Sequence, residues 1–196
     1  MPGCDKAGLV AERTGMGPRR AALRCATAAQ HETLESIFGP IETLSDYGRY
    51  LLFLTAFRSE VETKLHQMFR FHPVPYLPLQ DALAADCRDL GLAIPSPCGI
   101  LDLSDHEDEY LGALYVLEGS RLGAAVIREK AHRLQLSGDF GARHLDILTD
   151  GCSWPNFLSY LETATSMDEE ALIAGARKTF SFALEVASGA IHVEHC

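Results

Sequence analysis

The 196-residue sequence predicts an all-α protein with a single domain of about six to eight helices. Apolar residues recur at helical spacing in the long segments, and no segment shows the strict alternation of a half-buried strand. Glycines and prolines separate these segments. Because 47% of the residues are hydrophobic, a chain of this length can bury a substantial core in one domain.

The first 18 residues contain glycine, charge and proline without apolar periodicity, so we expect a flexible tail over 1–18 and a helical domain over 19–196. Three prolines exclude a helix over 72–78. The helices expected from the periodicity cover about 19–38, 44–71, 79–90, 104–136, 154–166 and 168–192.

The helix over 104–136 has an unusual sequence. Ser104-x-x-Glu107 is typical of a capping box at its start. Gly119 and Gly123 lie in its interior, where each costs about 0.5–1 kcal/mol relative to alanine. Together with Tyr115 they recur every four residues and share one face, which is therefore a groove without side chains. Such a groove indicates either a flat or bulky ligand pressed against the backbone or a close contact between two helices.

Composition excludes several classes of protein. The formal net charge of −10 argues against a surface for nucleic acid or anionic membrane. No apolar run is long enough to cross a bilayer, and residues 1–20 lack the apolar core of a signal peptide, so a cytoplasmic location is expected. The six cysteines are scattered without a C-x-x-C pair, which indicates reduced thiols rather than a zinc site.

His31 lies on the expected inward stripe of the helix over 19–38, where a lone histidine is usually a core residue. Two neighbours favour a ligand instead. Glu35, four residues on, can accept the Nδ1 proton and leave Nε2 free for a metal. Arg24 lies two turns away, about 10 Å at the helical rise. A basic residue at this distance from a metal-binding histidine suits a haem propionate.

Three stretches resemble the bacterial haem oxygenases. The proximal helix of that family is similar to LRCATAAQHETLE (Leu23–Glu35), and its distal helix to LGALYVLEGSRLGA (Leu111–Ala124). The closing helix is similar to GARKTFSFALE (Gly175–Glu185). This resemblance covers most of the chain from Arg19 onward, and it implies a fold in which haem b lies between a proximal helix and a kinked distal helix.

The resemblance implies a role for each matching residue. His31 would be the proximal iron ligand and Glu35 its hydrogen-bond partner. Gly119 and Gly123 would let the distal helix kink over the iron, with the small hydroxyl of Ser120 beside them. The further haem contacts are Arg24 and Tyr115 at a propionate, Phe180 in the pocket wall, Thr27 one turn before the histidine, and Arg133 as a second basic anchor.

A member of this family uses haem as both cofactor and substrate. The resemblance implies cleavage of haem with O2 to biliverdin, carbon monoxide and iron, with electrons from an external reductase of the ferredoxin or flavin type. A bacteriophytochrome is a candidate acceptor of the biliverdin, and no nucleic acid or membrane partner is expected. Two alternatives stay open: a haem carrier or sensor on the same fold without turnover, and a helical domain without haem in which the two glycines pack helices.

Two other clusters have simpler interpretations. The acidic residues Asp102, Asp105, Glu107, Asp108 and Glu109 are typical of charge complementing a helix N-terminus, with a docking patch for a basic redox partner as the alternative. Glu129 and His132 form a single E-x-x-H unit, whereas a di-iron site needs two, so they indicate a solvated face.

Overall fold

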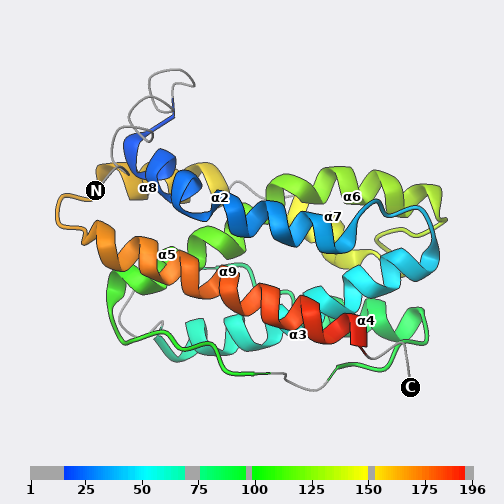
Figure 1. The fold of residues 1–196 in the computed structure, drawn as a ribbon. Helices are drawn as coiled ribbons and strands as arrows, with labels where there is room; N and C mark the ends of the chain where they lie inside the picture. The colour runs from blue at the N-terminus through cyan, green and yellow to red at the C-terminus, as the bar shows by residue number, and fades with distance from the viewer. Residues whose placement is uncertain (1–15, 69–75, 96–98, 150–152, 193–196) are drawn as a thin grey trace.

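A computed structural model describes residues 16–68, 76–95, 99–149 and 153–192, and within these ranges the chain forms eight helices and no β-strand (Figure 1). The expected all-α class is therefore confirmed. None of these helices is long and apolar enough to cross a membrane. The helices are α2 (Pro18–Phe38), α3 (Leu44–Met68), α4 (Gln80–Asp89), α5 (Glu107–Gly119), α6 (Arg121–Arg133), α7 (Arg143–Thr149), α8 (Ser153–Thr163) and α9 (Glu169–His192).

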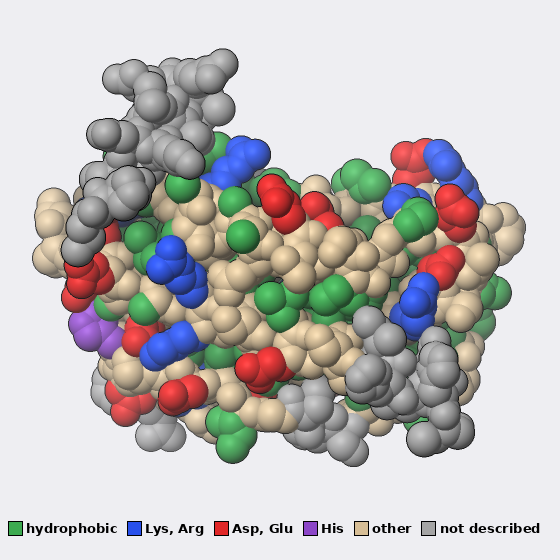
Figure 2. All heavy atoms as spheres, in the orientation of Figure 1, with side chains coloured by type: hydrophobic (Ala, Val, Ile, Leu, Met, Phe, Trp, Pro, Cys, Tyr) green, Lys and Arg blue, Asp and Glu red, His purple; other side chains and the backbone are tan. Residues whose placement is uncertain are grey.

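Helix α9 is the element on which the others assemble. It packs along α5, α2 and α3, and Figure 1 shows it running the length of the molecule beside α2. Its buried residues Leu172, Ala176, Ala183 and Val186 join the hydrophobic core. On the face drawn in Figure 2, acidic and basic side chains are interspersed, with hydrophobic side chains between them. Where its residues are described, that face carries no extended patch of one sign.

Two glycines allow α5 and α9 to approach each other closely. A Cβ on Gly112 would overlap the carbonyl oxygen of Leu172 and lie 2.6 Å from the backbone nitrogen of Ala176. A Cβ on Gly175 would overlap the carbonyl oxygen of Glu109. Backbone atoms of packed helices cannot move aside as a flexible side chain can, so neither position accepts a larger residue without separating the helices.

Helix α2 is tied to its neighbours near its start and in its middle. The Arg19 guanidinium donates to the backbone carbonyl of Ala164 at 2.7 Å, just beyond the end of α8. The Gln30 amide donates to the carbonyl of Arg177 at 3.0 Å, and the guanidinium of Arg177 donates back to the carbonyl of Ala26 at 3.1 Å. These reciprocal bonds fix the rotation of α2 about its axis, which decides which of its residues face outward.

The structure corrects the expected helix over 104–136. It consists of two helices, α5 and α6, with Ser120 between them. The expected capping box at Ser104 was wrong, because His106 is the N-cap and its Nδ1 accepts the N–H of Asp108 at 3.2 Å. The N–H of Ser104 instead donates to the carboxylate of Glu109 at 2.8 Å. The expected end of the second helix at residue 71 and part of the loop over 72–78 lie outside the described residues.

The sequence analysis did not predict α7, which a buried polar cluster holds in place. The Asp86 carboxylate on α4 accepts the backbone N–H groups of Arg143 at 3.0 Å and His144 at 3.1 Å. It also lies 2.8 Å from Nδ1 of His144, whose Nε2 is 3.5 Å from the hydroxyl of Tyr50. Burial lowers the pKa of His144, although the carboxylate of Asp86 acts to raise it. We infer that the folded protein keeps this imidazole neutral.

The glycine contact predicts a large effect of one methyl group. Gly112→Ala should lower the free energy of unfolding of the apo-protein by about 1–3 kcal/mol or more, because the added Cβ meets backbone atoms. Gly48→Ala in α3 is the matched control, since its Cβ would only reach the Leu92 side chain at 3.6 Å. Chemical denaturation followed by circular dichroism measures both. A wild-type midpoint for Gly112→Ala would contradict this close contact of α5 and α9.

The buried histidine predicts that acid weakens the fold. Because the pKa of His144 is lower in the folded than in the unfolded chain, the unfolded chain binds more protons below about pH 6.5, and stability falls as the pH decreases through that value. His144→Asn keeps a donor for Asp86 and does not titrate, so its unfolding free energy should vary less between pH 7.5 and 5.5. His132→Asn, at an exposed position, is the control and should retain the wild-type pH dependence. Equal slopes for all three proteins would exclude the proposed role of His144.

Candidate functional site

The imidazole of His31 is exposed to solvent, not buried as its place on the apolar stripe suggested. Its side chain is 57% exposed, and its ring makes an edge contact with the buried Phe180 on α9, with 5.9 Å between ring centroids. Nδ1 lies 3.6 Å from a carboxylate oxygen of Glu35, which is also exposed. A histidine with one side against an aromatic ring and a carboxylate near Nδ1 can offer Nε2 to a ligand.

The outward face of α2 continues on both sides of His31. Arg24, Ala28 and Glu35 are exposed on the same helix, at intervals of four, three and four residues. Thr27 differs from them, because it is buried and its hydroxyl donates to the carbonyl of Leu23 at 2.8 Å. The structure thus gathers Arg24, His31 and Glu35 on one face and turns Thr27 toward the core.

A second exposed face, with an apolar character, runs over the end of α5 and the first turns of α6. Gly119, Leu122, Gly123 and Val126 follow one another at helical spacing and share this face. Leu122 is 60% and Val126 59% exposed, which is unusual for large apolar side chains next to each other. A Cβ on Gly123 would meet nothing within 4 Å, and one on Gly119 would meet only the ring of Trp154, at 3.7 Å.

This geometry argues against close helix packing at Gly119 and Gly123. Close helix packing depends on Gly112 and Gly175, whereas Gly119 and Gly123 have room for a methyl group. Ser120, between them, is exposed, and its hydroxyl donates to the carbonyl of Leu117 at 2.7 Å. The groove expected at Gly119 and Gly123 is therefore open to a ligand.

Cationic side chains gather beside Tyr115, at the α5 end of this face. The guanidinium of Arg20 lies over the ring of Trp154, 5.6 Å from its centroid, and this ring is 5.7 Å from the ring of Tyr115. Burial raises the pKa of the Tyr115 hydroxyl, while the charges of Arg20 and Arg24 oppose that shift. The structure thus places Arg24 near Tyr115, and the resemblance implies a propionate contact for each of them. We call Arg20, Arg24, Tyr115 and Trp154 the arginine corner.

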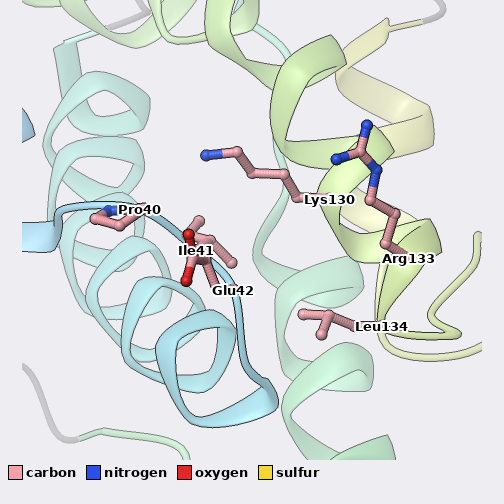
Figure 3. A pocket seen from close by; sticks show the side chains of 6 residues that line it. All are labelled: Pro40, Ile41, Glu42, Lys130, Arg133 and Leu134. Carbon is pink, nitrogen blue, oxygen red and sulfur yellow. The ribbon is translucent and has the colours of Figure 1, made fainter.

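Arg133 lies at the other end of α6, in a pocket of about 300 Å³ between that helix and the chain after α2 (Figure 3). Its guanidinium pairs with Glu129 at 2.5 Å. Lys130 lines the same pocket, and its chain extends across the space toward Pro40 and Ile41 in Figure 3. The sequence analysis missed Lys130, although it lies three residues before Arg133 and so on nearly the same face.

Other expectations are settled by burial and geometry. Asp108 and Glu109 are buried: Asp108 accepts the N–H of Asp168 at 2.8 Å, and Glu109 pairs with Lys178 at 2.9 Å. These two residues connect α5 to α9 and cannot take part in a docking patch. Among the described residues, no group of three or more histidine, cysteine or acidic side chains could hold a metal ion. A metal at His31 would need its other ligands from a cofactor.

Comparisons with known proteins identify the family and the fold. No family model matches the chain. It is 31% identical over 184 residues to heme oxygenase PigA of Pseudomonas aeruginosa, with 88% of this chain and 93% of the relative covered. Among solved structures, it is similar to the NO- and CO-bound heme oxygenase from Neisseria meningitidis, with a TM-score of 0.70 and 28% identity over 87% of this chain and 90% of that chain.

The open space at Gly123 predicts opposite effects of one substitution on stability and on ligand binding. Gly123→Ala should raise the unfolding free energy of the apo-protein by up to about 0.5–1 kcal/mol, because alanine favours helix and meets no atom. The same methyl should weaken hemin binding or slow haem degradation. Gly189→Ala on α9, also without a neighbour within 4 Å, is the control for helix propensity: it should raise the unfolding free energy in the same way and leave hemin binding and haem degradation unchanged. Loss of apo stability in Gly123→Ala, with normal hemin binding, would restore the packing interpretation.

Proposed function

The chain belongs to the bacterial haem oxygenase family, and from this premise we propose how its own residues hold haem and direct its cleavage. The protein degrades haem, using O2 and electrons from a reductase, to biliverdin, carbon monoxide and iron. Bound haem supplies the iron that activates O2 and is itself the substrate. The contributions of the protein are ligation, orientation and control of water.

The observation that carries the proposal is the exposed imidazole of His31. It lies on an outward helix face, has a carboxylate of Glu35 3.6 Å from Nδ1 and packs against Phe180. Haem fits these residues, because the porphyrin nitrogens would already bind the iron and His31 would supply the ligand from the protein. The Phe180 ring supports the imidazole from the side of the core, and Glu35 favours the tautomer whose Nε2 faces the ligand.

The basic residues at the two ends of the site are proposed to select how the haem is rotated. A haem carries both propionates along one edge, so it directs them to one end of the site at a time. The arginine corner offers Arg24, which has no carboxylate partner among the described residues, and the hydroxyl of Tyr115. At the other end, Glu129 already pairs with Arg133, while Lys130 has no ion-pair partner in the described ranges. We therefore assign the main propionate contact to Arg24 and a competing one to Lys130 with Arg133.

The distal face is formed by Gly119, Ser120 and Gly123. Without side chains at the two glycines, the backbone of the helix can approach the haem plane while leaving space for O2. The Ser120 hydroxyl gives its proton to the carbonyl of Leu117, so its oxygen remains able to accept a hydrogen bond from a water molecule. A serine can order water here but has no ionisable group that would take up the proton itself. Thr27 remains a predicted contact, and only through its methyl group, because its hydroxyl is bonded.

The partners complete the proposal. A separate electron donor of the ferredoxin or flavin reductase type delivers electrons to the bound haem, and a bacteriophytochrome is the proposed acceptor of biliverdin. The proposed compartment is the cytoplasm, where such donors occur. Incubation of the hemin complex with a ferredoxin–reductase pair, followed by chromatography of the bilin, tests turnover and identifies the meso carbon that is cleaved. A stable hemin complex that forms no bilin with any reductant would favour a haem carrier.

Removing the axial ligand tests the site directly. His31→Ala should leave the unfolding free energy of the apo-protein within about 0.5 kcal/mol of wild type, because the side chain is largely exposed. The hemin complex should lose the spectrum of a histidine-ligated ferrous haem, and biliverdin formation should fall sharply and recover in part with added imidazole. His132→Ala, at an exposed position on α6, is the control. Wild-type spectra and biliverdin yield in His31→Ala would place the iron on another residue.

A further inference from the structure

Four buried charged residues lie beneath the break between α5 and α6. Glu118 is the last residue but one of α5, and Arg121 is the first residue of α6; their charged groups are 3.6 Å apart. On α3, the guanidinium of Arg58 donates to the Glu62 carboxylate at 2.7 Å. All four side chains are buried, so the two ion pairs are part of the interior of the protein.

The backbone of the segment after residue 75 joins the two ion pairs. Arg58 donates to the carbonyl of Leu77 at 2.8 Å, and the N–H of Leu77 is 3.4 Å from the carboxylate of Glu118. The N–H of Leu79 donates to both carboxylate oxygens of Glu62, at 3.1 and 3.2 Å. A continuous polar connection therefore runs from α3, through Leu77, to the residues on either side of Ser120.

The break lies at the Gly119-Ser120 pair, a feature at which helices commonly kink. Ser120 has helical backbone angles, φ −58° and ψ −22°, and its N–H still bonds to the carbonyl of Val116 at 3.2 Å. Its hydroxyl donates to the carbonyl of Leu117 at 2.7 Å and so competes with the helical backbone for that acceptor. These local features permit a bend but do not fix its size, so contacts outside this segment are needed to hold α6 at its angle to α5.

Stability alone does not explain the four charges. A buried ion pair loses its hydration and is often no more stabilising than apolar residues of the same volume. In addition, Nη1 of Arg58 and Nη2 of Arg121 have no acceptor among the described residues, which adds to the cost. Charge-assisted hydrogen bonds, however, require specific distances and angles. A network of them therefore tolerates little displacement of the helices that it joins.

We propose that Glu118 and Arg121, held by Arg58 and Glu62, are positioning residues that set the angle between α5 and α6. This angle in turn sets the position of the Gly119–Gly123 face over the haem. The inference rests on the proposed placement of haem at that face. None of the four side chains needs to touch the haem, since each acts through the backbone on either side of Ser120.

The sole tryptophan of the chain reports on this angle in the apo-protein. Trp154 lies 3.7 Å from the position of a Cβ on Gly119 and contacts Tyr115, so a change in the end of α5 alters its surroundings. Glu118→Gln and Arg121→Met should each shift the Trp154 emission to the red and increase its quenching by acrylamide, at temperatures where both proteins remain folded by circular dichroism. Combining the two substitutions should add little, because each breaks the same pair.

In the hemin complex, the same variants should separate binding from turnover. We expect hemin affinity within about threefold of wild type, since the ligand and propionate contacts remain. Biliverdin formation should fall by about tenfold or more, because the distal face is misplaced. Glu109→Gln is the control: it breaks an ion pair on the same helix, between the buried Glu109 and the partly exposed Lys178 on α9, eleven residues before Ser120. It should leave both the Trp154 signal and turnover near wild type.

Unchanged Trp154 emission and quenching in both Glu118→Gln and Arg121→Met would overturn the proposal, and so would an equal change in Glu109→Gln. If Glu118→Gln does not fold, Glu62→Gln removes the charge one step further along the connection, and the same comparison applies. The Trp154 measurement needs no haem. Failure of the wild-type protein to form a histidine-ligated complex would therefore count against the proposed haem site and leave the result for the helix angle standing.

Discussion

The contact between α5 and α9 at Gly112 and Gly175 is the constraint on which the rest of the structure depends. It brings two backbones together, so the start of the distal helix has a fixed distance from α9. The same α9 carries Phe180, which supports His31, and exchanges hydrogen bonds with α2 through Arg177. Helix α9 thus anchors both α2, which carries His31, and α5, which ends at Gly119.

The helix class and most helix positions could be predicted from the sequence, because apolar periodicity over ten or more residues is a strong signal. Helix α7 has only seven residues, Arg143–Thr149, and is held by hydrogen bonds to Asp86 on α4. Its apolar periodicity is therefore too short to predict a helix. The division at Ser120 falls at the kink that the resemblance implied, although the apolar periodicity alone runs through it as one helix. Helix α7, in contrast, depends on residues distant in sequence.

In the candidate site, too, the sequence predicts relations between residues on one helix but not contacts between helices. The proximity of His31 to Glu35 could be predicted because both lie on one helix, four residues apart. The role of a glycine depends on its tertiary neighbour: Gly112 faces the backbone of α9, and Gly123 faces open space, although both lie in the same stretch of sequence. Lys130 was missed because its relation to the end of α2 exists only in the folded protein.

The attachment of α2 determines where the molecule can open. Near its start, Arg19 bonds to the chain beyond α8, and in its middle Gln30 and Arg177 join it to α9, so the helix that carries His31 is fixed along most of its length. Helix α6 has fewer supports: it packs mainly on α7 and carries the exposed Leu122 and Val126. An outward movement of α6 would therefore disturb fewer contacts than one of α2, and it would have to turn about Ser120, next to the buried Glu118–Arg121 pair.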